Sequence, residues 1–167
     1  MTTVRQFSIK QAGISLLEVS LSVGIIAVIL VLATMLYYTT SNNQQINILT
    51  TNMGALSDAE TRWALNHNGT YATTATAVND LVKNGYLSPS LAGCTVSGSG
   101  ASVTYTGCAV PNPWGGTIAI AAGATANTVT FTGKANNLTT CNQVNDQNRG
   151  DIICSTTTLA IVKTLGA

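Results

Sequence analysis

Four cysteines, all in the second half of the chain, are the residues whose chemistry stands out first: Cys94, Cys108, Cys141 and Cys154. Thiolates can ligate zinc, but zinc sites usually combine closely spaced CxxC pairs with one another or with histidines. None of these cysteines stands in a CxxC pair, and the chain has a single histidine, His67. We therefore expect no metal site. An even number of cysteines favours disulfide bonds formed in an oxidising compartment.

The carboxylate of Glu18 stands beside a long apolar segment. From Val19 to Tyr38 the chain reads VSLSVGIIAVILVLATMLYY, which as a helix would span about 30 Å, the thickness of a bilayer core. A carboxylate carried towards a bilayer costs about 2–3 kcal/mol, so it usually has a partner. Residues 14–38 contain no lysine, arginine or histidine. We therefore expect Glu18 to need a positive group that the translated segment does not supply.

Cleavage between Gly13 and Ile14 would supply such a group. It would leave a free α-amine four residues before Glu18, and in a stack of parallel helices this amine could meet the Glu18 carboxylate of a neighbouring copy. The alternative is that Glu18 extends to the cytoplasmic headgroups, since the basic residues Arg5 and Lys10 place the N-terminal flank in the cytoplasm. A secretory signal peptide is disfavoured, because the apolar run is too long and no small-residue cleavage site follows it.

Gly13 and the residues after it, ISLLEVSLSVGIIAVILVLA, resemble the prepilin cleavage motif of type IV pilins and related pseudopilins. The resemblance covers about residues 5–40 and combines a basic leader, Gly, a hydrophobic residue, Glu four residues later and a long apolar helix. It implies that a prepilin peptidase removes residues 1–13 and N-methylates Ile14, where most relatives carry Phe, Met or Leu. It also implies a subunit that is stored in the lipid of the bacterial inner membrane with a periplasmic head. The assembly machinery there would polymerise it with itself into an extracellular pilus for adhesion, aggregation or mating contact.

Two other functions fit parts of this pattern. A pseudopilin of a type II secretion system has a similar N-terminal segment, but such proteins typically lack a C-terminal disulfide. A membrane-anchored ectodomain that never polymerises fits the apolar segment and leaves Glu18 unexplained. With 8% charged residues and a net charge of +1, the chain has no electrostatic footprint for nucleic acid. No catalytic or cofactor-binding motif stands out, so we expect neither an enzyme nor a cofactor.

The element that must position Glu18 is one long helix. No proline precedes Pro89, and we expect a helix from about Ser15 to Leu65 that ends at the turn formers Asn66–Gly69. Its first half, residues 14–40, is apolar all round and has no face to pack on a head. Its second half, residues 41–65, carries an apolar stripe with one polar slot at Glu60. The stripe consists of Ile46, Leu49, Met53, Leu56 and Trp63.

The rest of the globular head, which begins at residue 41, predicts an α+β fold. A connecting region over residues 66–100 holds a short helix that begins with a cap at Asn79 and ends at Gly85. Residues 101–167 alternate in the manner of strands, and we expect an antiparallel sheet of four or five strands packed on residues 46–65. The expected strands are Ala101–Thr106, Gly116–Ala121, Asn127–Gly133 and Leu159–Lys163.

Spacing alone leaves three disulfide pairings open. The polar segment between Cys141 and Cys154 resembles the disulfide-bounded C-terminal region of type IV pilins, especially the type IVb branch of toxin-coregulated and conjugative thin pili. That resemblance favours Cys141–Cys154 together with Cys94–Cys108. A nested arrangement, Cys94–Cys154 with Cys108–Cys141, is the alternative.

Two short motifs carry little weight. Arg149-Gly150-Asp151 spells an integrin-binding tripeptide, but tripeptides recur by chance. Asp146 and Asp151 could offer oxygens to calcium, but two carboxylates lack the pattern of a calcium loop.

Overall fold

A computed structural model describes residues 15–73, 76–99, 102–123, 127–148 and 150–166. Its contacts divide the chain into two compact units, Met1–Ser41 and Asn42–Ala167. The fold is α+β: a long N-terminal helix, antiparallel sheets and two disulfide bonds. Gly13 and Ile14 lie outside the described residues.

The N-terminal helix α1 runs from Leu16 to Asn66, which confirms the predicted helix within one residue at each end. It ends where the chain turns left-handed, with φ of 53° at Asn68 and 79° at Gly69. The Gly69 N–H donates to the Ala64 carbonyl oxygen over 2.8 Å, so one of the last helical carbonyls gains a partner.

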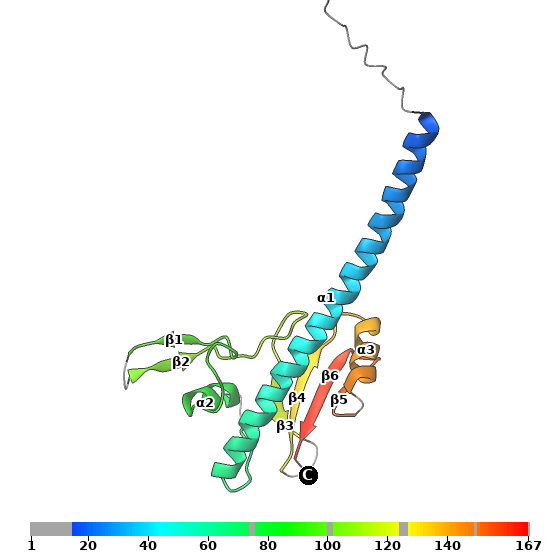
Figure 1. Cartoon of the computed structure of the whole chain (residues 1–167). Coiled ribbons are helices and arrows are strands. Elements are labelled where there is room, and N and C mark those ends of the chain that lie inside the picture. The colour runs from blue at the N-terminus through cyan, green and yellow to red at the C-terminus, as the bar shows by residue number, and fades with distance from the viewer. Residues whose placement is uncertain (1–14, 74–75, 100–101, 124–126, 149, 167) are drawn as a thin grey trace, which may run out of the picture. The chain divides into compact units, whose positions relative to one another are not determined.

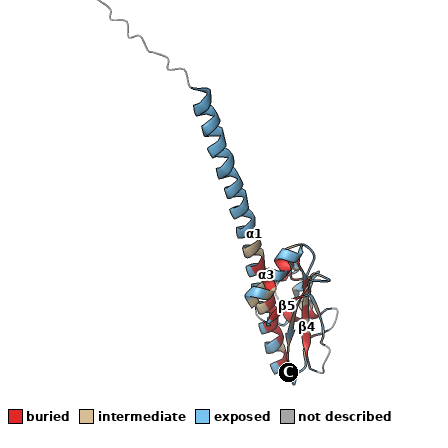
Figure 2. Ribbon diagram, turned by 90° about the vertical axis from the view of Figure 1, so that its right-hand side faces the viewer, coloured by how far each residue is buried: buried red, intermediate tan, exposed pale blue. Residues whose placement is uncertain are grey.

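Burial changes sharply along α1, as Figure 2 shows. Every apolar residue from Leu16 to Tyr38 that exceeds alanine in size is exposed. The stripe predicted further along is buried: Ile46, Leu49, Met53 and Leu56 are each at most 1% exposed, while Trp63 is half-buried. Only the second half of α1 therefore contributes to a hydrophobic core.

A four-stranded antiparallel sheet forms the centre of the head (Figure 1). Its strands are β3 (Ala119–Ala122), β4 (Val129–Lys134), β5 (Ile152–Cys154) and β6 (Ala160–Leu165), in the order β3-β4-β6-β5. The α1 stripe packs on this sheet at Gly133 of β4. A methyl group added there would lie 3.4 Å from the side chains of Leu49 and Met53, so glycine allows the helix to approach closely.

The head also contains a second, smaller sheet. Strands β1 (Thr95–Ser97) and β2 (Thr104–Thr106) form a separate two-stranded hairpin, and helix α2 (Ala77–Lys83) contacts β2. The prediction that α2 is capped by Asn79 is wrong. The helix begins two residues earlier, and the Asn79 side chain instead accepts a hydrogen bond from the Cys108 N–H.

The main sheet has four antiparallel strands, as expected, but the strand expected within residues 101–106 is β2, which lies in the separate two-stranded sheet. Strands β1 and β5 have no counterpart in the prediction, and neither has a helix, α3 (Leu138–Asn148), which includes Cys141. Asn137 caps it, because its side-chain oxygen accepts the Thr140 N–H over 2.8 Å. The buried residues of α3 are Thr140, Cys141 and Val144, a spacing that places them on one helical face.

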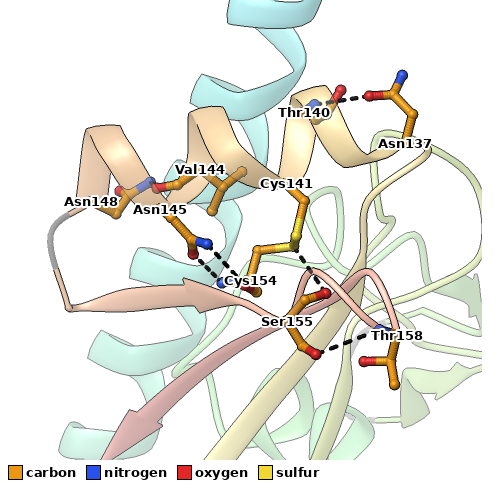
Figure 3. The surroundings of a disulfide bond; sticks show 9 residues. All are labelled: Asn137, Thr140, Cys141, Val144, Asn145, Asn148, Cys154, Ser155 and Thr158. Atoms are coloured by element: carbon orange, nitrogen blue, oxygen red, sulfur yellow. Dashed lines mark hydrogen bonds between the residues drawn. A yellow bond between two sulfur atoms is a disulfide. The ribbon is translucent and has the colours of Figure 1, made fainter.

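The disulfides are Cys94–Cys108 and Cys141–Cys154, the local pairing that the sequence favours. Figure 3 shows the second, which ties α3 to β5. Asn145 reinforces the same junction, since its amide donates to the Cys154 carbonyl oxygen and its oxygen accepts the Cys154 N–H. Cys141 and Cys154 are buried, whereas Cys94 and Cys108 are half-buried.

Glu60 is the least expected member of the core. The side chain is fully buried; one carboxyl oxygen accepts the Ala72 N–H over 2.9 Å, and the other has no partner among the described residues. Burial raises the pKa of Glu60 to about 7, and the hydrogen bond from Ala72 lowers it by less.

The raised pKa makes the stability of the head fall as pH rises. The unfolded glutamate loses its proton near pH 4.5, whereas the folded one holds it until about pH 7. Between these values the native state binds more protons, so the free energy of unfolding drops, by on the order of 2–3 kcal/mol. Urea denaturation from pH 4.5 to 7.5 measures this drop. Glu60→Gln should remove most of it, and Asp146→Asn, a change at an exposed carboxylate on α3, should preserve it.

Candidate assembly site on the N-terminal helix

Glu18 lies in the first turn of α1. Its backbone N–H donates to the Ser15 carbonyl oxygen over 2.9 Å. The positive end of the helix dipole favours a carboxylate at this position. The side chain is exposed and makes no hydrogen bond or ion pair with any described residue. Gly13 and Ile14 lie outside the described residues, so the predicted pairing with the Ile14 amine stays a prediction.

Glu18 is also electrostatically isolated along the helix. Between Ser15 and Ser57 it is the only residue with an ionisable acidic or basic group of the Asp, Glu, Lys, Arg or His type. Any positive partner inside a lipid layer or a helix bundle must therefore come from before residue 15 or from another molecule. An unpaired carboxylate in such surroundings is costly, so a cation in that place would be held strongly.

Four hydroxyl groups on the same part of α1 have hydrogen-bond partners. Ser20, Ser22, Thr34 and Thr39 each donate to a carbonyl oxygen three or four residues earlier, over 2.8 to 3.0 Å. Such back-bonding allows serine and threonine to enter an apolar environment without a further partner. These hydroxyls have no role in the predictions from the sequence, although their position on an expected helix was a usable signal. Glu18 is the one charged side chain on this part of α1.

The surface of α1 beyond Glu18 is mostly apolar. Helix α1 is long and apolar enough to cross a membrane, by length and composition. Its most apolar stretch of 18 residues contains no buried residue. Large side chains at successive positions are widely exposed, from Leu16 at 85% to Tyr38 at 69%. A surface of this extent is far larger than the apolar patches of ordinary monomers. Such a surface could serve as a membrane anchor.

The other candidate residues from the sequence, Asp146 and Asp151, form no second assembly site within the described part of the chain. Asp151 makes an ion pair with Lys163 over 3.2 Å, so the aspartate of the integrin-like tripeptide already has a partner, and Arg149 lies outside the described residues. Asp146 is exposed on α3. Across the described ranges, no three metal-ligating side chains gather in one place.

Comparison with protein-family models, with curated proteins and with solved structures finds no match to this chain. A functional proposal therefore rests on the residues and geometry described above.

Proposed function

We propose that the chain is the precursor of a type IV pilin, a subunit that is stored in a bacterial inner membrane and polymerised through α1 into an extracellular fibre. The observation that carries the proposal is the pairing of two features on one helix. Residues 16–38 expose apolar side chains all round, and a single carboxylate, Glu18, lies at their start without a partner among the described residues. The prepilin-like motif around Gly13 and Ile14 and the α+β head with its disulfides support the same proposal.

The physical basis of assembly is an exchange of surroundings. Lipid covers the apolar part of α1 before assembly, and the same part of neighbouring subunits covers it in the fibre core. Packing and hydrogen bonds, rather than a hydrophobic driving force, decide between two apolar environments. Gly24 would help close packing. It has no side chain, and the space that a methyl group would take there is open, so a neighbouring helix can approach the backbone.

Glu18 would then fix the register between neighbours. Cleavage after Gly13 creates the positively charged amine of Ile14, and the Glu18 carboxylate of an adjoining subunit attracts it. In apolar surroundings such an attraction is many times stronger than in water. A helix that slid out of register would leave both charges buried and unpaired, which costs several kcal/mol. The fibre would serve adhesion, aggregation or mating contact.

Two measurements on the same cells test the proposal. Mass spectrometry of the mature protein should give the mass of residues 14–167 plus one methyl group, with the two disulfides intact. Electron microscopy of material sheared from the cell surface should show long filaments containing the protein. An intact Met1 together with an absence of filaments would favour a membrane-anchored ectodomain. Cleavage without long filaments would favour a pseudopilin.

A further inference from the structure

A cleft of about 600 Å³ lies on the head, between the end of α1 and the start of α2. Its volume falls within the range of about 300–1,000 Å³ that is typical of small-molecule sites. The side chains that characterise it come from α1, from the loop that follows and from α2, and we call it the α1–α2 cleft. They are Trp63, His67, Asn68, Tyr71, Thr73 and Asp80.

One wall of the α1–α2 cleft is aromatic and held in place. The rings of Trp63 and His67 stack with centroids 3.9 Å apart and planes within 5°, and Tyr86 meets Trp63 edge-on at 5.8 Å. The His67 ring donates to the Trp63 carbonyl oxygen over 2.8 Å. Asn66 donates to the Tyr86 hydroxyl over 3.0 Å. A wall fixed in this way loses little conformational entropy when a ligand binds.

The lining of the cleft also offers polar groups. Among the residues that the structure describes, the side chains of Asn68 and Thr73 have no hydrogen-bond partner. One oxygen of Asp80 accepts from Thr76 over 3.1 Å, which leaves the other oxygen as an acceptor. Asn68 adopts a left-handed backbone conformation, with φ of 53°, and its amide is exposed. The cleft thus combines donors and acceptors in a small volume.

The charged side chains in the lining of the cleft limit the class of ligand that it can bind. Among the described residues of the lining there is one carboxylate, Asp80, and neither lysine nor arginine, so a phosphate or carboxylate ligand would find no lysine or arginine partner. A purely cationic ligand would use acceptors alone and leave the donors of Asn68 and Thr73 idle. A ring with hydroxyl groups at its edge and C–H groups on its faces uses the donors, the acceptors and the aromatic wall together.

We propose that the α1–α2 cleft binds a neutral saccharide. The site belongs wholly to the head, so the proposal stands whether or not the subunit polymerises. It gives the head a ligand of its own, a glycan on a surface or on another cell, through the planar amide of Asn68, the Asp80 carboxylate and the Trp63–His67 stack.

The test uses the full chain in a polyoxyethylene detergent, which has no sugar headgroup. The probes are fluorinated glucose, galactose and mannose and a fluorinated trimethylammonium compound, followed by broadening of their ¹⁹F NMR signals. We expect at least one sugar to bind with a dissociation constant on the order of 1 mM. No broadening with any sugar, or broadening with the ammonium probe alone, overturns the proposal.

Two variants locate the binding. Asn68→Gly removes the amide at a position whose positive φ suits glycine, and Asp80→Asn keeps an acceptor for Thr76 while it removes the charge. Each should weaken sugar binding about fivefold, as expected from the loss of one hydrogen bond. Asp146→Asn removes an exposed carboxylate on α3 and should leave binding unchanged. Equal binding by all three variants and the parent chain overturns the assignment, and circular dichroism confirms that each variant is folded.

Discussion

A Glu18→Val variant is expected to enter the membrane normally and to yield at least about tenfold fewer surface filaments than the parent chain. Insertion should be unaffected or improved, because the change removes a charge that opposes transfer into lipid. Assembly should fail, because the Ile14 amine of each incoming subunit would be buried without a counter-charge, at a cost of several kcal/mol. A loss of 1.4 kcal/mol in the association free energy already lowers an equilibrium tenfold. Membrane fractionation and immunogold counting of sheared filaments measure the two effects separately.

Two matched variants sharpen this test. Glu18→Gln keeps the size and hydrogen-bonding capacity and removes only the charge, so it should impair assembly nearly as much as valine does. Asp58→Asn removes an exposed carboxylate from the same helix within the head and should leave filament number unchanged. Normal filaments from Glu18→Val would remove the electrostatic role of this residue, even if the chain still proved to be a pilin.

The second large effect is expected from the disulfide at the end of α3. Replacing Cys141 and Cys154 together by alanine should lower the free energy of unfolding of the head by about 3 kcal/mol through the loss of loop closure alone. The two sulfur atoms also fill buried space, since these residues are 0% and 3% exposed, so a cavity adds to the cost. Urea denaturation of the full chain in detergent, followed by tryptophan fluorescence, measures the difference.

The other disulfide is a close control, because the two bonds span 14 and 13 positions and their loop-closure terms are nearly equal. Replacing Cys94 and Cys108 by alanine should cost less, since these residues are half-buried beside the two-stranded β1–β2 hairpin, which can open locally without unfolding the main sheet. An equal or larger loss from this pair would mean that the hairpin unfolds together with the rest of the head.

The strong periodic signals in the sequence predict much of the fold. The apolar run and the 3-4 stripe define α1 to within one residue, because more than 50 residues without proline leave few alternatives, and Asn68 and Gly69 end the helix as turn formers do. The approximate positions of strands β2, β3, β4 and β6 along the chain follow from the alternation of apolar and polar residues. Cysteine pairing was favoured through resemblance and not through spacing, which leaves all three arrangements open.

The missed elements depend on tertiary contacts. Helix α3 has few apolar residues, and it is stabilised by the Asn137 cap, by the Cys141–Cys154 bond and by burial of Val144. Strand β5 has three residues, too few for an alternation to show, and it gains its place by pairing with β6. For the candidate site, Glu18 stood out because its charge was isolated. The α1–α2 cleft did not, because Trp63 and Asp80 come to line one cleft only after the chain turns at Gly69.

The order of the strands has a consequence for export. β6 follows β3, β4 and β5 along the chain, yet it is the strand that joins β4 to β5. In the exported subunit that we propose, β4 and β5 reach the periplasm with unpaired backbone edges and wait for residues 160–165 to emerge. Exposed edges of this kind recruit strands from other chains. In such a subunit, the edges of β4 and β5 would therefore stay open to other chains until β6 emerges.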